Sequence, residues 1–326
     1  MRRLLKLSLQ KPEMAASLLL LLLVIFFQAR SNMVFLSYDN LRGMLGYLPE
    51  VGLVAVGVTL LMICGEFDLS VGSVFALMPM TMAVMMVAGW GFWPATGLGL
   101  LVCAFIGFLN GWITIKFAIP SFITTLGMLF MARSLTVVIS GGFPPRLNMD
   151  LIPEHLFISY VGPGDLFRAS FLWFVGISIL ISLLLSKTNF GNWVRATGGY
   201  LPAAEALGIP ANKVKIACFM ICSVLAGLAG LFQVLRLGSP LPSIGEGLEL
   251  VAAAVIGGTA LAGGIGSIIG GIIGAVLIRV IDNGMVMSQV DSNWFKFAVG
   301  ALTILAVVGN SWLRKRGRAM KVETEK

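Results

Sequence analysis

The chain has 326 residues, of which 58% are hydrophobic and only 12% are charged. Soluble domains carry about 25% charged residues, so this composition excludes a soluble enzyme, a secreted disulfide scaffold and a disordered chain. The net charge is +8, but the basic residues lie in loops and tails, which indicates membrane orientation rather than nucleic-acid binding.

The apolar runs are continuous and lack the apolar–polar alternation of barrel strands, so they predict membrane-spanning helices. We expect an all-α, polytopic transmembrane bundle with about ten spans. The short runs 48–64 and 248–262 border Gly-rich turns, and one of them could be a broken or re-entrant helix. The expected spans are 14–36, 48–64, 70–88, 93–115, 119–140, 169–186, 213–234, 248–262, 265–283 and 294–312.

Lysine and arginine predict the orientation, because cytoplasmic loops carry an excess of both. The bias favours both termini in the cytoplasm, with a basic N-terminus over 1–13, a membrane domain over 14–312 and a basic tail over 313–326. The long loop 141–168 then lies outside and the loop 187–212 inside. The first span resembles a signal peptide, but its cleavage site is poor, and we expect it to be retained.

The inner loop contains a short helix. Residues 202–207 are good helix formers that begin with Pro202, and Gly208 and Pro210 follow as stop signals. The pattern alone favours an ordinary interfacial helix. The alternative is a helix that transmits force from a soluble partner.

A short connection with two carboxylates, over residues 65–73, joins two expected spans. We expect Asp68 to cap the following helix, with substrate contact and proton relay as the alternatives. The candidate turn or gating residues in this connection are Gly65, Asp68, Ser70 and Gly72.

Two further stretches carry candidate residues. The Gly-rich segment 255–271 favours close helix packing and chain reversal within the membrane, and its turn or gating candidates are Gly257, Gly258, Gly263, Gly264 and Gly266. Uncharged polar groups suit a path for a neutral solute, or else hydrogen bonds between helices. These pathway candidates are Asn110, Ser121, Thr124 and Thr125.

The sequence lacks the motifs of several chemistries. It has no GxxxxGK[ST] segment, so the chain itself cannot cradle ATP, and it has no HExxH, GxSxG or Cys/His metal spacing. We therefore expect no catalytic residue, no metal and no cofactor on this chain. Charges within the spans are few, which argues against an ion-driven transporter.

Several blocks resemble the ribose/xylose-type sugar permeases of bacterial ABC importers. They are VGVTLLMICGEFDLSVGSVFAL (56–77), IPSFITTLGMLFMARSLTVVISGG (119–142), ATGGYLPAAEALGIPANKVKI (196–216), ELVAAAVIGGTALAGGIGSIIGGIIGAVLI (249–278) and IDNGM (281–285). The resemblance runs from about residue 45 to 310. One departure is that Glu66-Phe67 stands where related chains usually have Gly-Ile.

The resemblance implies an inner-membrane permease that works with three partners. These are a second permease chain, a periplasmic substrate-binding protein and a cytoplasmic ABC ATPase that binds ATP and Mg²⁺. It also implies alternating access and a coupling helix that docks into the ATPase. That helix maps onto Ala203, Ala204, Glu205, Ala206, Leu207, Gly208 and Ile209.

The alternatives concern the cargo and the energy source. Permeases for nucleosides and for branched-chain amino acids share the broader superfamily, and we favour a monosaccharide or polyol over both. A stand-alone secondary transporter and a membrane enzyme are weaker alternatives, because core carboxylates are few and catalytic motifs are missing from the sequence.

Overall fold

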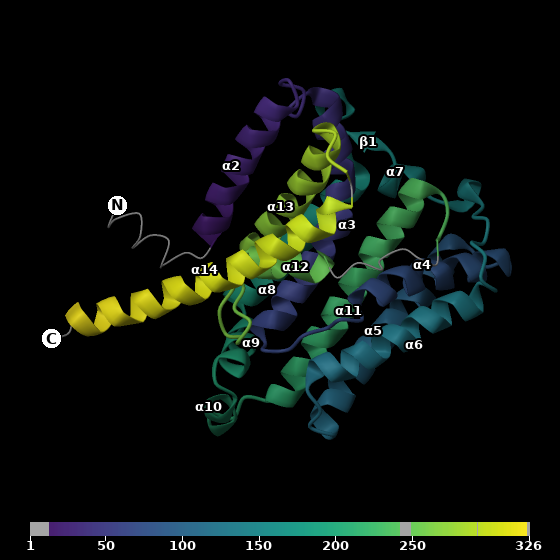
Figure 1. Ribbon diagram of the computed structural model, residues 1–326. Coiled ribbons are helices and arrows are strands. Elements are labelled where there is room, and N and C mark those ends of the chain that lie inside the picture. The colour runs from purple at the N-terminus through teal and green to yellow at the C-terminus, as the bar shows by residue number, and fades with distance from the viewer. Residues whose placement is uncertain (1–12, 242–248, 292, 325–326) are drawn as a thin grey trace.

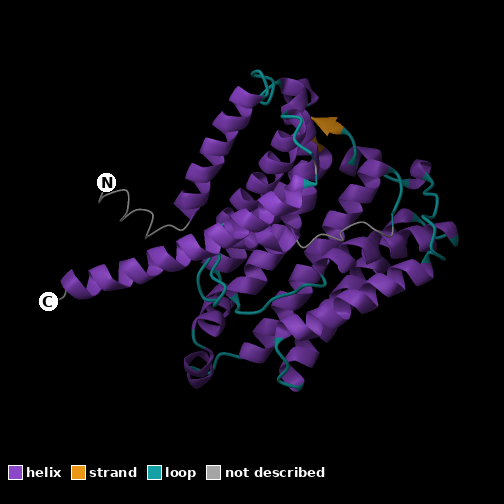
Figure 2. Cartoon of the chain, in the orientation of Figure 1, coloured by secondary structure: helices purple, strands orange, loops and turns teal. Residues whose placement is uncertain are grey.

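The computed structural model describes residues 13–241, 249–291 and 293–324, and helices dominate them (Figures 1 and 2). The expected all-α, multi-pass class is confirmed. The long helices are α2 (Glu13–Arg30), α3 (Tyr38–Ile63), α4 (Val71–Val87), α5 (Phe92–Lys116), α6 (Ser121–Ile139), α8 (Ala169–Lys187), α11 (Ala211–Leu237), α13 (Ile268–Met287) and α14 (Trp294–Thr324). The shorter helices are η1 (Met149–Leu151), α7 (Glu154–Phe157), η2 (Pro163–Asp165), α9 (Asn189–Gly199), α10 (Leu201–Ala206) and α12 (Glu249–Ile256).

Among the described residues, seven helices are long and apolar enough to cross a membrane: α2, α3, α5, α6, α8, α11 and α13. Helix α4 and the apolar part of α14, Trp294–Gly309, are shorter. The expected count of ten spans is therefore not confirmed. The part of the basic tail up to Thr324 continues α14 as a helix, whereas residues 1–12 of the basic N-terminus lie outside the described residues.

Two spans differ from their expected bounds. Helix α3 begins ten residues before the expected start at 48 and continues through Pro49. The described part of α12 has eight residues, which cover about 12 Å at 1.5 Å per residue. Within the described residues 249–262, the expected span 248–262 is a helix up to Ile256 followed by a turn, as in the broken-helix alternative; residue 248 lies outside them.

Helices α3 and α11 form the centre of the bundle. In their most apolar windows 89% and 72% of residues are buried, against 11% in the peripheral α2. Close packing of α5 against α11 depends on Gly107, where an added Cβ would lie 2.6 Å from the Phe219 carbonyl oxygen. Because nothing larger than hydrogen fits there, the two helix backbones approach closely.

The bundle has two distinct ends (Figure 1). One, the hairpin end, carries α7 and the antiparallel pair β1 (Tyr160–Val161) and β2 (Phe167–Arg168), and there the Tyr38 hydroxyl donates to the Gly164 carbonyl. The other, the α10 end, carries α9 and α10. Helix α3 connects the two, since it begins near β2 and ends beside α9.

Candidate functional site

The turn between α3 and α4, residues 64–70, contains a buried carboxylate. The Asp68 Oδ1 atom accepts hydrogen bonds from the Ser70 backbone N–H at 2.7 Å and the Ser70 hydroxyl at 2.6 Å, and its Oδ2 accepts one from Asn110 Nδ2 at 3.3 Å. Burial raises the pKa of Asp68, and these hydrogen bonds oppose that shift. Asp68 thus holds the backbone and the hydroxyl of Ser70, which is itself the N-cap residue of α4. Capping by Asp68 stays a prediction, because its hydrogen bonds go to Ser70 and Asn110 and not to N–H groups of the first helical turn.

Hydroxyl groups of α6 bind the backbone of the same turn. The Phe67 N–H donates to Ser121 Oγ at 3.1 Å, and the Leu69 N–H donates to Thr125 Oγ1 at 3.0 Å. The Thr124 hydroxyl oxygen is buried and has no hydrogen-bond partner among the described residues. The structure therefore brings Ser121 and Thr125, with Asn110, around the turn as supports, while Thr124 takes no part.

An ion pair joins this turn to the start of α11. Lys215 Nζ lies 2.6 Å from Glu66 Oε1, and the two side chains are only 17% and 10% exposed. Lys215 follows α10 by nine residues in the chain. The pair therefore ties the turn 64–70 directly to the helix that follows α10.

Glycines of three segments meet in direct backbone contact at the α10 end, and we call this cluster the glycine junction. The Gly264 N–H donates to the Ile63 carbonyl at 2.8 Å. An added Cβ on Gly198 would lie 1.9 Å from that same carbonyl oxygen, and one on Gly263 would lie 2.6 Å from the Gly198 oxygen. The members of the junction are Gly65, Gly198, Gly199, Gly263 and Gly264.

The remaining glycine candidates pack helices or form turns. Gly257 abuts the Gly270 carbonyl at the contact of α12 with α13, and Gly258 lies in the turn after α12 with φ +94°. The Gly266 carbonyl accepts a hydrogen bond from Arg195 Nη1 of α9 at 3.1 Å. The Gly72 carbonyl, in the first turn of α4, accepts one from Arg133 at 3.4 Å. These contacts make the candidates structural links between elements.

Residues 200–209, which contain α10 and which we call the α10 segment, project from the bundle with apolar groups exposed to solvent. Leu207 is 80% exposed and Tyr200 is 68% exposed; Ala203 and Glu205 are exposed as well, whereas Ala204 packs inward. The chain turns at Gly208 with φ +77°, where the sequence predicted a stop. An exposed apolar tip of this kind fits a protein partner.

A second ion pair lies near the hairpin end, and the sequence did not predict it. Arg236 of α11 donates to both carboxylate oxygens of Glu50 in α3, at 2.5 and 3.1 Å. The Arg236 guanidinium also lies 3.8 Å from the centroid of the Tyr47 ring. The guanidinium of Arg279, which pairs with Asp282, lies 4.7 Å from the same ring centroid. The available signal was Glu50 itself, an acid within an expected span.

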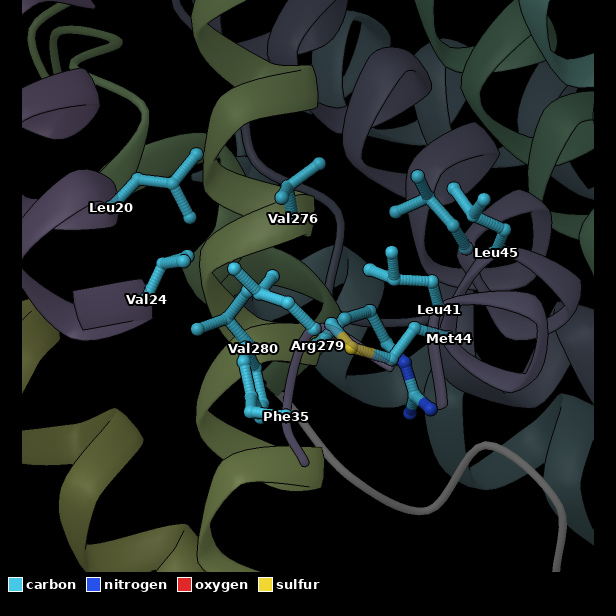
Figure 3. Close-up of a pocket in the computed structure, with 11 residues that line it drawn as sticks. Leu20, Val24, Phe35, Leu41, Met44, Leu45, Val276, Arg279 and Val280 are labelled. Carbon is cyan, nitrogen blue, oxygen red and sulfur yellow. The ribbon is translucent and has the colours of Figure 1, made fainter. Parts of the chain in front are cut away.

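A cavity lies between α2, α3 and α13 (Figure 3), and no residue of the turn 64–70 lines it. Its lining is apolar except for Arg279, whose guanidinium is paired with Asp282. A sugar needs several polar partners, so we do not assign this cavity to a sugar. Its lining consists of Leu20, Val24, Phe35, Leu36, Leu41, Met44, Leu45, Leu48, Val276, Arg279 and Val280.

Comparisons with known proteins give a consistent result. Residues 40–307 match the family described as the branched-chain amino acid transport system / permease component. The xylose/arabinose import permease of Sulfolobus acidocaldarius is 31% identical over 300 residues, which cover 89% of this chain and 82% of the relative. The ribose import permease of Escherichia coli K12 is 34% identical over 296 residues, which cover 90% of this chain and 91% of the relative.

The autoinducer 2 import system permease of Yersinia enterocolitica is 34% identical over 270 residues, which cover 80% of this chain and 72% of the relative. No solved structure matches the chain. The family match covers the bundle from α3 into α14 and includes both the turn 64–70 and the α10 segment. The chain therefore belongs to this family of transport-system permeases, and its similarity to ribose and xylose/arabinose import permeases extends over most of its length.

Proposed function

We propose that the chain is the membrane-spanning subunit of an ATP-driven ABC importer that carries a monosaccharide or polyol. The observation that carries this proposal is the similarity to ribose and xylose/arabinose import permeases over about nine-tenths of the chain. The chain itself is not an enzyme in this proposal. ATP and Mg²⁺ bind to a separate ATPase subunit, and no cofactor binds here.

The ATPase docks on the α10 segment. The exposed Leu207 and Tyr200 support this assignment, because apolar side chains on a water-facing tip are stabilised when a partner covers them. Ala203 to Ile209 then form the coupling helix. Glu205, which is exposed, offers a polar contact at the edge of the interface with the ATPase.

The charge distribution supports an α10 end that faces the cytoplasm. Lys116, Lys187, Arg195, Lys213 and Lys215 all belong to the ends of helices or the connections that gather there. The hairpin end then faces the periplasm and receives a sugar-loaded binding protein. In this orientation the protein is a multi-pass component of the bacterial inner membrane with cytoplasmic termini.

Transport proceeds by alternating access between two permease chains. ATP binding closes the ATPase dimer and displaces α10, the pair opens toward the periplasm to accept sugar, and hydrolysis resets it. The permease requires little affinity for the sugar, because the binding protein supplies it.

The test is co-expression with the ATPase and binding protein encoded beside this chain, followed by ATPase and uptake assays in nanodiscs and proteoliposomes. We expect the ATPase to remain bound and the loaded binding protein to stimulate hydrolysis. A panel of pentoses, hexoses and polyols identifies the cargo. A nucleoside and leucine belong in the panel, since the family description names branched-chain amino acids. Uptake driven by an ion gradient, without any ATPase, would contradict the proposal.

A further inference from the structure

One continuous segment contacts the turn 64–70 at both of its ends. At the beginning of the segment, Gly198 lies against Gly65 and the Ile63 carbonyl. At its end, Lys215 forms the ion pair with Glu66. Helix α10 projects between these two contacts, so residues 198–215 form a loop that is anchored twice on one turn.

Both anchors are stiff. In the glycine junction the backbones already touch, and an added Cβ on Gly264 would lie 2.6 Å from the Gly199 Cα. A displacement of α9 therefore cannot be absorbed by side-chain rearrangement there. The ion pair is nearly excluded from water, where charge attraction is stronger and less screened by salt than at the surface.

The turn in its own right is fixed to the bundle. Asp68 holds Ser70 and Asn110, and Ser121 and Thr125 bind the Phe67 and Leu69 N–H groups. A displacement that reaches Glu66 thus reaches α3, α4, α5 and α6 together. The glycine junction also joins the turn 64–70 to the turn after α12, which contributes Gly263 and Gly264 to the junction.

We propose that Glu66 and Lys215 are coupling residues, which transmit a displacement of the α10 segment to the turn 64–70 during transport. They act as positioning residues and do not touch the cargo. The inference rests on the proposed function, because an ATPase must supply the displacement. It goes beyond that function by assigning the coupling to one ion pair.

The test uses charge reversal at each partner and at both. The variants are E66K, K215E and the swap E66K/K215E, with E66Q as a neutral variant that keeps the side-chain shape. The matched control is K213E, because Lys213 lies two residues before Lys215 on α11 but is exposed. Each is reconstituted with its ATPase and binding protein, and sugar transported per ATP hydrolysed is measured.

We expect each single variant to lower that ratio about tenfold, within the 5- to 150-fold range of typical couplings between sites. The swap should restore the ratio to within about threefold, since it recreates the pair, and K213E should leave it unchanged. A ratio that the single variants leave unchanged would overturn the proposal, as would a folded swap variant that restores nothing.

A second measurement needs no partner protein. Hydrogen exchange of the permease alone in nanodiscs reports on the amides of residues 66–70. K215E should increase their exchange and the swap should reverse the increase; unchanged exchange would overturn the link between Lys215 and the turn. Failure of the wild-type chain to bind any ATPase would instead contradict the proposed function, so the two failures are distinguishable.

Discussion

At the scale of residues, two buried ion pairs join segments that are distant in the chain, one near each end of the bundle. Glu50 and Arg236 are separated by 186 residues, and their side chains are only 7% and 10% exposed. A buried charge that loses its partner keeps the cost of its desolvation without the attraction that offset it. Each pair therefore constrains which substitutions the bundle tolerates.

We predict that Glu50→Ala destabilises the bundle by about 3 kcal/mol or more, because it leaves Arg236 buried without a counter-charge. The double variant Glu50→Met with Arg236→Met should recover most of that loss. Thermal unfolding in detergent, followed by tryptophan fluorescence, measures both. Glu205→Ala is the control, since Glu205 is exposed and loss of an exposed charge costs at most about 1 kcal/mol. Equal destabilisation by the single and double variants would contradict the pairing argument.

At the scale of elements, the contact of α5 with α11 depends on glycine in one place and not in another. Gly107 faces the α11 backbone, where an added Cβ would lie 2.6 to 2.9 Å from backbone atoms of Phe219 and Met220. Gly97, in the same helix, has no atom within 4 Å of its added Cβ. Helix α5 therefore contains its own internal control.

We predict that Gly107→Ala forces α5 away from α11 and destabilises the protein by about 1 to 3 kcal/mol, the usual cost of overpacking. Gly97→Ala should be neutral or stabilise by up to about 1 kcal/mol through helix propensity. Thermal unfolding of the two variants in parallel separates packing from propensity. Similar behaviour of both would show that the close approach is unimportant.

The α10 segment is predicted to act through its surface alone. Leu207→Asp should leave thermal stability within about 0.5 kcal/mol, because a side chain that is 80% exposed loses few contacts. It should nevertheless abolish co-purification of the ATPase. The control is Leu151→Asp, an exposed leucine in η1, in the loop 141–168 at the hairpin end, which should retain the ATPase. Loss of binding in both variants, or in neither, would refute the docking assignment.

At the scale of the whole molecule, the α10 end and the hairpin end are expected to face opposite sides of the membrane. Cysteine labelling tests this directly, because all four native cysteines are buried and should resist a membrane-impermeant maleimide. Tyr200→Cys should react only after the membrane is opened, and Leu151→Cys should react in intact spheroplasts. Labelling of both from the same side would contradict the orientation.

Local signals made several elements predictable. Pro202 and Gly208 gave α10 to within one residue of its observed bounds, since capping and turn residues act locally. The start of α3 was missed because the polar stretch Tyr38–Gly43 and Pro49 interrupt the apolar pattern. The Arg236 partner of Glu50 lies in another helix, and no local pattern encodes that contact.

In the candidate site, too, local features are predictable from the sequence and contacts between distant segments are not. The composition of the turn 64–70 singles out its residues, but not their partners: the hydroxyls of Ser121 and Thr125 fit either a solute path or hydrogen bonds between helices, and the sequence does not say which backbone groups they bind. The glycine junction unites three segments that are far apart in sequence. Such a contact depends on tertiary packing, and spacing along one chain cannot reveal it.

The peripheral position of α2 has a consequence for biogenesis. This helix packs mainly on α13, and its residue Arg30 precedes the first residue of α13, Ile268, by 238 positions (268 − 30). At roughly 5 to 20 residues per second, α2 leaves the ribosome some tens of seconds before its packing partner exists. The surface of α2 is almost entirely apolar, and Leu18, Leu21 and Ile25 are more than half exposed. We therefore expect α2 to insert into the lipid bilayer by itself and to remain stable there until α13 is synthesised. The contact between α2 and α13 then forms late, when α13 has been synthesised and packs against the waiting α2.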